Sequence, residues 1–289
     1  MGKILIIADR DKTCVATSRG LELAEKLGHQ AEVVAFVYAP LDRVTGGETG
    51  KIEARQRILD ARREEVQARI DRFASDAQRV ALKVVWLKDI YPWINKRASS
   101  VDFAAVVKTS HTSGTLTYTS TDWHLLRECP APVLLVAEKK WHRTKPVLAA
   151  LDLGSKKKSK RVLNEKILET AISMSSALGV ELKIVSALEV PTMLSELDLI
   201  DPDTYAKEQR AELLPHLKAL AKKFDLPEKA FTTKRGPVDK VITSQAAKAR
   251  AQIVVIGTVA RQGLKAKLIG NTCESVLQQL RTDIIAIKP

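Results

Sequence analysis

Short runs of consecutive apolar residues alternate with longer amphipathic stretches along the whole chain. Lys3–Asp9 and Pro146–Asp152 are two such runs, and each ends in an aspartate. Runs of Val, Ile, Leu and Ala without alternation are typical of strands buried on both faces of a parallel sheet. The stretches between them, such as the one from about Ile52 to Phe73, carry apolar residues at helical spacing. The pattern predicts an α/β fold in which strands and helices alternate.

The predicted elements occur twice in the same order, which indicates an internal duplication. Each half predicts a doubly wound domain with a mainly parallel, five-stranded sheet, and we place the domains at residues 1–142 and 143–289. The second long helix, from about Asp203 to Phe224, contains Pro215, which should kink it or end its first part. The matched strands are Lys3–Asp9 and Pro146–Asp152, Glu32–Val37 and Glu181–Leu188, Leu82–Leu87 and Phe231–Lys234, Ala105–Thr109 and Val254–Thr258, and Val133–Val136 and Ile284–Ile287.

The last strand of each half is an apolar sheet edge that needs cover. Val133–Val136 and Ile284–Ile287 could cover each other across a pseudo-two-fold axis, which would make the chain an internal pseudo-dimer. We therefore expect intramolecular domain–domain pairing through these strands, antiparallel to each other. The sequence leaves a homo-oligomer open.

The charge is strongly positive and unevenly distributed. The formal net charge is +13, with 22 basic and 18 acidic residues in 1–142 and 25 basic and 16 acidic residues in 143–289. The densest basic run, Ser155–Arg161, follows the strand that ends at Asp152. It is either a solvated loop or an anion site for phosphate, a lipid head group or RNA. An aromatic content of 4% offers no stacking platform for bases, which disfavours nucleic acid as the partner.

The remaining composition favours a cytoplasmic protein without a metal site or a membrane span. Three scattered cysteines without CxxC spacing argue for a reducing compartment and against a disulfide framework or a structural zinc. The five histidines form no metal-binding spacing. No apolar stretch approaches the roughly 20 residues that span a bilayer.

No constellation of catalytic residues stands out. P-loop, GxGxxG and GxSxG motifs are absent from the sequence. His124 and Asp122 stand two residues apart on a predicted helix, so their side chains do not face each other. We therefore expect no catalytic residues and no conventional enzyme, with slow, incidental hydrolysis of a bound ligand left open.

A glycine-containing loop joins a buried strand to the last helix. Gly257 and Gly263 let backbone N–H groups approach a ligand closely, while Gly270 and Asn271 open a helix whose free N–H groups favour phosphate. Arg261 could add positive charge. From these residues alone, an anion cradle and an ordinary turn remain equal alternatives.

The loop resembles the signature of universal stress proteins, in which glycine, two residues, glycine, nine residues, glycine and a hydroxyl residue hold ATP phosphates. Gly257 and Gly270 match this spacing, whereas Ala260 and Asn271 depart from it. Thr121–Arg127 is similar to the first half of the two-domain, UspE-like subgroup. In the ATP-binding members an aspartate at the end of the first strand contacts the adenosine, and Asp152 has that place here.

The resemblance implies a tandem universal stress protein with Rossmann-like, adenine-nucleotide alpha-hydrolase-like domains. Its ligand would be a small anionic molecule, ATP or another adenine nucleotide, held in the second domain while the first has a degenerate loop, with Lys108 in place of Gly257. The alternative is that nucleotide binding is lost and the chain is an interaction module for protein, RNA or lipid partners. The predicted binding residues are Asp152, Gly257, Thr258, Arg261, Gly263, Gly270, Asn271 and Thr272.

Overall fold

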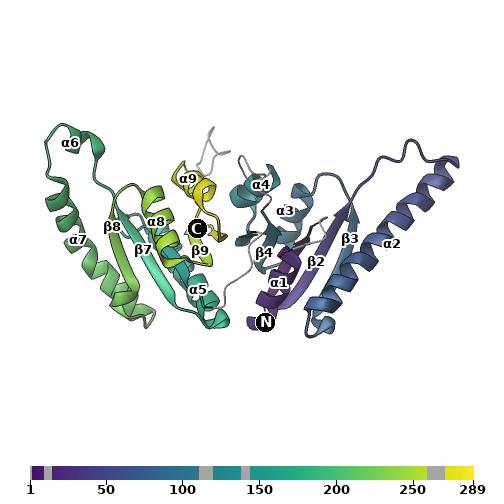
Figure 1. Cartoon of the computed structure of the whole chain (residues 1–289), viewed down its shortest axis with the longest axis horizontal. Coiled ribbons are helices and arrows are strands. Elements are labelled where there is room, and N and C mark those ends of the chain that lie inside the picture. The colour runs from purple at the N-terminus through teal and green to yellow at the C-terminus, as the bar shows by residue number, and fades with distance from the viewer. Residues whose placement is uncertain (1, 10–14, 111–119, 138–143, 259–270) are drawn as a thin grey trace. The chain divides into compact units, whose positions relative to one another are not determined.

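The computed structural model describes residues 2–9, 15–110, 120–137, 144–258 and 271–289. The chain consists of two compact units, Met1–Glu138 and Lys139–Pro289. Figure 1 shows both units, with strands and helices alternating along each.

Unit 1 is a parallel sheet with the strand order β3-β2-β1-β4-β5. The chain moves outward from β1 to β2 and β3, and then returns to the other side of β1 for β4 and β5. Its strands are β1 Lys3–Ala8, β2 Gln30–Val37, β3 Val80–Trp86, β4 Phe103–Thr109 and β5 Val133–Val136. Its helices are α1 Val15–Lys26, α2 Gly47–Phe73, the short 3-10 helix Ala77–Arg79, α3 Tyr91–Ser100 and α4 Ser120–Glu128.

Unit 2 repeats this topology with the parallel order β8-β7-β6-β9-β10. Its strands are β6 Val147–Leu151, β7 Leu182–Leu188, β8 Phe231–Arg235, β9 Ile253–Gly257 and β10 Asp283–Ile287. Its helices are α5 Lys158–Leu178, α6 Thr192–Glu196, α7 Pro202–Lys223, the short 3-10 helix Glu228–Ala230, α8 Val238–Ala249 and α9 Asn271–Gln279. The predicted pair of doubly wound, parallel sheets is thereby confirmed, and the ten predicted strands all occur.

The central strands form the core of each unit. Every residue of β1 from Ile4 to Ala8 is buried, as is all of β6. Because successive side chains point to opposite faces of a sheet, both faces of these strands must be covered by helices. In unit 2, α7 packs on β7 and β8, and Figure 1 shows it alongside these strands.

The duplication is also visible where the first helix of each unit ends. Gly28 follows α1 and Gly179 follows α5, and both have a φ of 65°. This left-handed conformation lets backbone N–H groups bond back to the last turn, which glycine allows without strain.

Two outcomes were predicted for Pro215, a kink in the helix or an end to its first part, and the second is wrong. Helix α7 runs without interruption from Pro202 to Lys223, with Pro215 inside it. Proline in a helix loses one backbone hydrogen bond and crowds the preceding turn. Pro215 lies on the exposed face, where water can satisfy the freed carbonyl, while Leu217, Leu220 and Ala221 remain buried on the sheet side.

No helix in the described ranges is long and apolar enough to cross a membrane. The expected pairing of the two final strands concerns one unit against the other and stays a prediction.

Candidate functional site

Unit 2 contains a cavity of about 460 Å3 at the carboxyl ends of its central strands. The chain leaves β6 toward β7 on one side and returns to β9 on the other, so the strand order reverses between β6 and β9. Open parallel sheets bind ligands at this switch point because the loops there diverge and leave a crevice. Asp152, directly after β6, and Gly257, the last residue of β9, both line the cavity.

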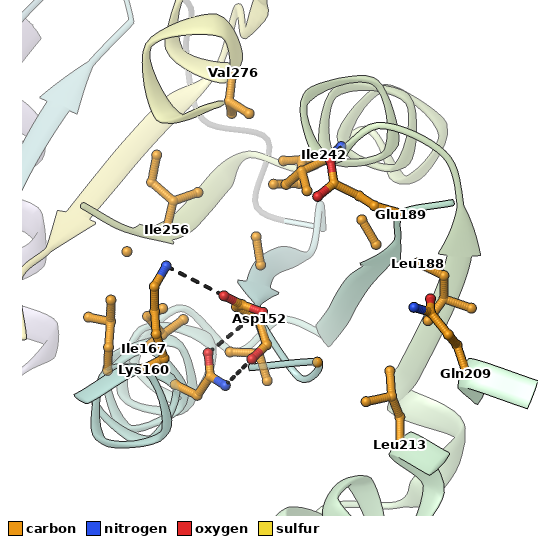
Figure 2. Close-up of a pocket in the computed structure, with 18 of the residues that line it drawn as sticks. Asp152, Lys160, Ile167, Leu188, Glu189, Gln209, Leu213, Ile242, Ile256 and Val276 are labelled. Carbon is orange, nitrogen blue, oxygen red and sulfur yellow. Dashed lines mark hydrogen bonds and ion pairs between the residues drawn. The ribbon is translucent and has the colours of Figure 1, made fainter. Parts of the chain in front are cut away.

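Asp152 is held in place by its backbone. The Asn164 side-chain amide on α5 donates to the Asp152 carbonyl at 2.8 Å, and its oxygen accepts the Asp152 N–H at 3.0 Å. Asn164 is itself buried. The two bonds fix the direction in which the chain leaves β6, so the carboxylate points toward the cavity (Figure 2).

Lys160 is the partner of that carboxylate. Its Nζ lies 3.4 Å from an Asp152 carboxylate oxygen, across the first turn of α5 (Figure 2). Half of the Asp152 side chain is still exposed. The pair is therefore accessible to a ligand, and exposed pairs of this kind contribute little to stability.

The cavity walls combine apolar and polar surface in about equal parts. They come from β6, α5, β7, α7, α8, β9 and α9, so the site joins segments that are far apart in the sequence (Figure 2). The apolar lining residues are Ala150, Leu151, Leu163, Ile167, Ala187, Leu188, Leu213, Val238, Ile242, Ile256 and Val276.

The polar groups at the cavity are mainly acceptors. Three carboxylates, Asp152, Glu189 and Glu212, line it against the one lysine among the described lining residues, Lys160. The Asn164 and Gln209 amides also line it. This set favours the donor groups of a ligand, such as hydroxyl and amino groups.

A carboxylate braces the two helices on one wall. Asp239 on α8 accepts a hydrogen bond from the Ser275 hydroxyl on α9 at 2.8 Å, and this bond holds the pKa of the Asp239 carboxyl below its usual range. Gln279 donates to the same oxygen at 3.3 Å. The brace holds α8 beside α9, and these helices contribute Ile242 and Val276 to the cavity wall.

Gly257 is required by packing. A Cβ at this position would lie 2.6 Å from Leu163 Cδ2 and 3.1 Å from Ile167 Cδ1. The glycine therefore lets α5 approach β9 and shapes the cavity floor. The structure thus gives Gly257 a steric role, which the sequence alone did not indicate.

Of the predicted binding residues, the structure brings together Asp152 and Gly257. Thr258 is buried and turned away, since its hydroxyl donates to the Ile287 carbonyl at 3.3 Å and its N–H donates to the same oxygen at 2.7 Å. Asn271 and Thr272 lie in the first turn of α9. Arg261, Gly263 and Gly270 lie outside the described residues.

The prediction missed several lining residues. Lys160 could have been found, because it belongs to the basic run whose position after the first strand of unit 2 was noted. In that run Lys156, Lys157, Lys158 and Arg161 are exposed, as a solvated loop requires, and Lys160 alone lines the cavity. Glu189, Gln209 and Glu212 carry no sequence signal, because only packing brings α7 beside the end of β7.

The same switch point in unit 1 carries charged side chains of the chain itself. Lys108 Nζ on β4 lies 2.8 Å from a carboxylate oxygen of Asp122, and both side chains are buried. Arg62 on α2 donates to the Ala8 carbonyl at 3.2 Å and to the Asp9 carbonyl at 2.5 Å. The Asp9 carboxylate accepts from the Thr109 hydroxyl. In unit 1, ion pairs and hydrogen bonds thus join the ends of the central strands to the neighbouring helices. The corresponding elements of unit 2 surround a cavity.

Fold and site together define a class: an α/β protein of two tandem, doubly wound units with a crevice at the switch point of the second. The family model described as the universal stress protein family matches residues 1–137 and again residues 144–288. The chain belongs to the universal stress protein family.

Curated relatives cover most of the chain. It is 32% identical to universal stress protein E of Escherichia coli (strain K12) over 241 aligned residues. This alignment covers 81% of this chain and 76% of the relative. It is 30% identical to a universal stress protein E homolog of Haemophilus influenzae, over 82% of this chain and 79% of the relative. The expected resemblance to the two-domain subgroup is confirmed.

Solved structures show the same fold over the full length. A protein of unknown function from Pseudomonas aeruginosa matches with a TM-score of 0.70 and 23% identity, over 99% of this chain and 92% of that one. A universal stress protein from Archaeoglobus fulgidus matches with a TM-score of 0.68 and 16% identity, over 99% and 98%. Both likenesses support the fold.

Proposed function

We propose that this member of the family is a non-catalytic stress-response protein whose second unit binds an adenine nucleotide or a similar anionic small molecule. Family membership supports the stress-response role. The observation that carries the ligand proposal is the cavity at the switch point of unit 2, with Asp152 and Gly257 at the ends of adjacent strands.

The size and lining of the cavity fit a nucleoside. Small-molecule sites measure about 300–1,000 Å3 and are mostly apolar with a few placed polar groups. The cavity of about 460 Å3 lies in this range. Apolar walls such as Ile242 and Val276 suit a flat base, while the Asp152 carboxylate suits the donors of a sugar.

The ligand's charge would lie at the other end. The described lining residues are net acidic, with three carboxylates against Lys160, so a phosphate is better placed away from them. Gly257 opens the segment in which the sequence predicts the phosphate contacts, namely Arg261, Gly263, Gly270 and Asn271. We propose that base and sugar occupy the cavity and that phosphates extend toward this segment and α9.

Isothermal titration of the full chain with ATP and with adenosine tests the proposal. We expect micromolar ATP binding, weaker adenosine binding, and a loss of about 10–100-fold in ATP affinity on Asp152→Ala, the range for a hydrogen bond to a charged group. The matched control is Glu181→Gln, which removes an exposed carboxylate of unit 2 that does not line the cavity.

Two outcomes would count against nucleotide binding. If ATP releases no heat and shifts no melting temperature, the alternative role as an interaction module becomes the better description. If ATP binds but Asp152→Ala and Glu181→Gln behave alike, the ligand lies elsewhere on the chain.

A further inference from the structure

Unit 2 exposes an unusually apolar and acidic segment between β7 and α7. Four large side chains within seven residues are exposed: Met193 by 72%, Leu194 by 38%, Leu197 by 62% and Leu199 by 65%. Soluble proteins seldom expose so many neighbouring apolar side chains, and such a patch marks an interaction site. We refer to residues 192–200 as the acidic apolar segment.

The charge around this segment is of one sign. Residues 189–203 contain five acidic residues and no Lys or Arg. Glu196 and Asp198 lie within the segment and form no ion pair with a described residue. This contrasts with the rest of unit 2, because residues 143–289 hold 25 basic residues and only 16 acidic ones, five of them in 189–203.

A surface of the opposite sign lies at the same edge of the sheet. Lys156, Lys157, Lys158 and Arg161 are exposed in the loop after β6 and the first turn of α5, and none of them pairs with a described carboxylate. Val162, next to Arg161, is 40% exposed. We refer to these five residues as the basic patch.

Both surfaces lie at the edge of the sheet where the cavity is found. The basic patch follows β6 and the acidic apolar segment follows β7, and these strands are parallel neighbours, so both loops leave the same edge of the sheet. Asp152 and Glu189, which precede the two surfaces in sequence, both line the cavity (Figure 2). One copy of the chain therefore presents an acidic and a basic surface at the same edge of the sheet of unit 2.

The charges restrict what could cover the segment. A nucleic acid or an anionic membrane would be repelled by its carboxylates. The occupant must offer basic side chains beside some apolar surface, and a second copy of this chain offers four exposed basic side chains and Val162 at its basic patch. Two copies related by a two-fold axis make this contact twice, since a two-fold interface pairs each surface with its counterpart reciprocally.

We infer that the chain forms a symmetric dimer in which the acidic apolar segment of each copy docks on the basic patch of the other. Opposite charges orient the encounter, and burial of Met193, Leu197 and Leu199 supplies the free energy of association. The inference does not depend on which ligand the cavity binds. It adds a partner copy at the edge of the sheet where each cavity lies.

Sedimentation velocity of the full chain tests this dimer. We expect a dimer at low ionic strength whose dissociation constant rises at least about tenfold at high salt, because surface charges are screened. The variant Met193→Ser with Leu197→Ser should weaken the dimer by a similar factor. The matched control is Ile52→Ser, which changes an equally exposed apolar residue on α2, 68% exposed.

A charge exchange makes the test specific. Glu196→Lys with Asp198→Asn, and separately Lys157→Glu with Lys158→Glu, should each weaken the dimer. Asparagine is chosen at 198 because it tolerates the positive φ of 52° there as aspartate does. The four substitutions together should associate more strongly than Glu196→Lys with Asp198→Asn alone, because the patch, now without net charge, no longer repels the positive segment.

Three results would overturn the inference. One is a monomer at concentrations up to about 0.1 mM at low salt, which would point to a basic partner protein as the occupant. Another is a dimer that none of the segment variants weakens. The third is a four-fold variant that associates no better than Glu196→Lys with Asp198→Asn alone.

Discussion

At the scale of single residues, the position of Asp152 depends on Asn164. Asparagine offers both a donor and an acceptor, so one buried side chain can satisfy the N–H and the carbonyl of the same distant residue. Buried backbone groups need such partners because an unsatisfied one costs free energy. Asn164 therefore acts as a positioning residue for the cavity.

We predict that Asn164→Ala lowers the free energy of unfolding by about 1–3 kcal/mol, since the Asp152 N–H and carbonyl lose both bonds. It should also weaken ligand binding, because Asp152 is no longer directed at the cavity. Urea denaturation and isothermal titration measure the two effects. The control Gln67→Ala removes an exposed bond to Asp71 on α2 and should change stability by no more than about 0.5 kcal/mol.

At the scale of elements, α3 and α4 of unit 1 are tied by an ionisable pair. The Tyr91 hydroxyl donates to Glu128, and the Tyr91 ring stacks on His124 at a centroid distance of 4.6 Å. The hydrogen bond from Tyr91 lowers the pKa of the Glu128 carboxyl, whereas burial and the bond to Glu128 raise the pKa of Tyr91 from 10.0 to about 12.

The pair should be sensitive to both acid and base. Because the pKa of Glu128 is lowered, its stabilising contribution is present above the unfolded value of 4.5 and is lost as the pH falls below it. Because the pKa of Tyr91 is raised, its contribution is present below pH 10 and is lost as the pH rises toward 12. Between these limits the tie is intact.

We predict that Tyr91→Phe reduces stability at neutral pH by about 0.5–1.5 kcal/mol, the value of one hydrogen bond. The difference from the unchanged chain should shrink toward both pH extremes. Denaturation curves measured across the pH range check this. Tyr38→Phe is the control, since the Tyr38 hydroxyl bonds to no described residue; an identical pH profile for both variants would contradict the assignment.

At the scale of the whole molecule, one topology occurs twice with different contents at its switch point. Unit 2 has a cavity lined by Asp152 and Gly257, whereas unit 1 has the buried ion pair of Lys108 and Asp122. Breaking such a pair leaves one charge buried and costs several kcal/mol. Replacing either Lys108 or Asp122 alone would therefore destabilise unit 1.

We predict that a saturating nucleotide protects unit 2 and leaves unit 1 unchanged in hydrogen–deuterium exchange of the full chain. Protection should occur around residues 150–167, 187–189 and 209–213, which line the cavity, because a bound ligand stabilises the state it binds. Protection around Asp9 or Lys108 would instead place the ligand in unit 1.

Much of the fold could be predicted because it depends on local patterns. Buried strands are continuous apolar runs, and the predicted strand Val133–Val136 matches β5 residue for residue. The duplication could be predicted because the two halves of the sequence contain matching strands in the same order. The continuation of α7 through Pro215 could not be predicted, since proline only weakens a helix and the sheet-side packing of Leu217 and Leu220 sustains it.

The sequence by itself determined the family, the strands and helices, and two residues that line the cavity, Asp152 and Gly257, because each follows from contiguous residues or fixed spacings. Only the tertiary structure decided which other side chains meet at the cavity. Glu189, Gln209 and Glu212 reach it from β7 and α7 through the register of parallel strands, while the Thr258 hydroxyl is drawn to the Ile287 carbonyl. A side chain's direction depends on neighbours that lie far away in the chain, and packing alone brings those neighbours together.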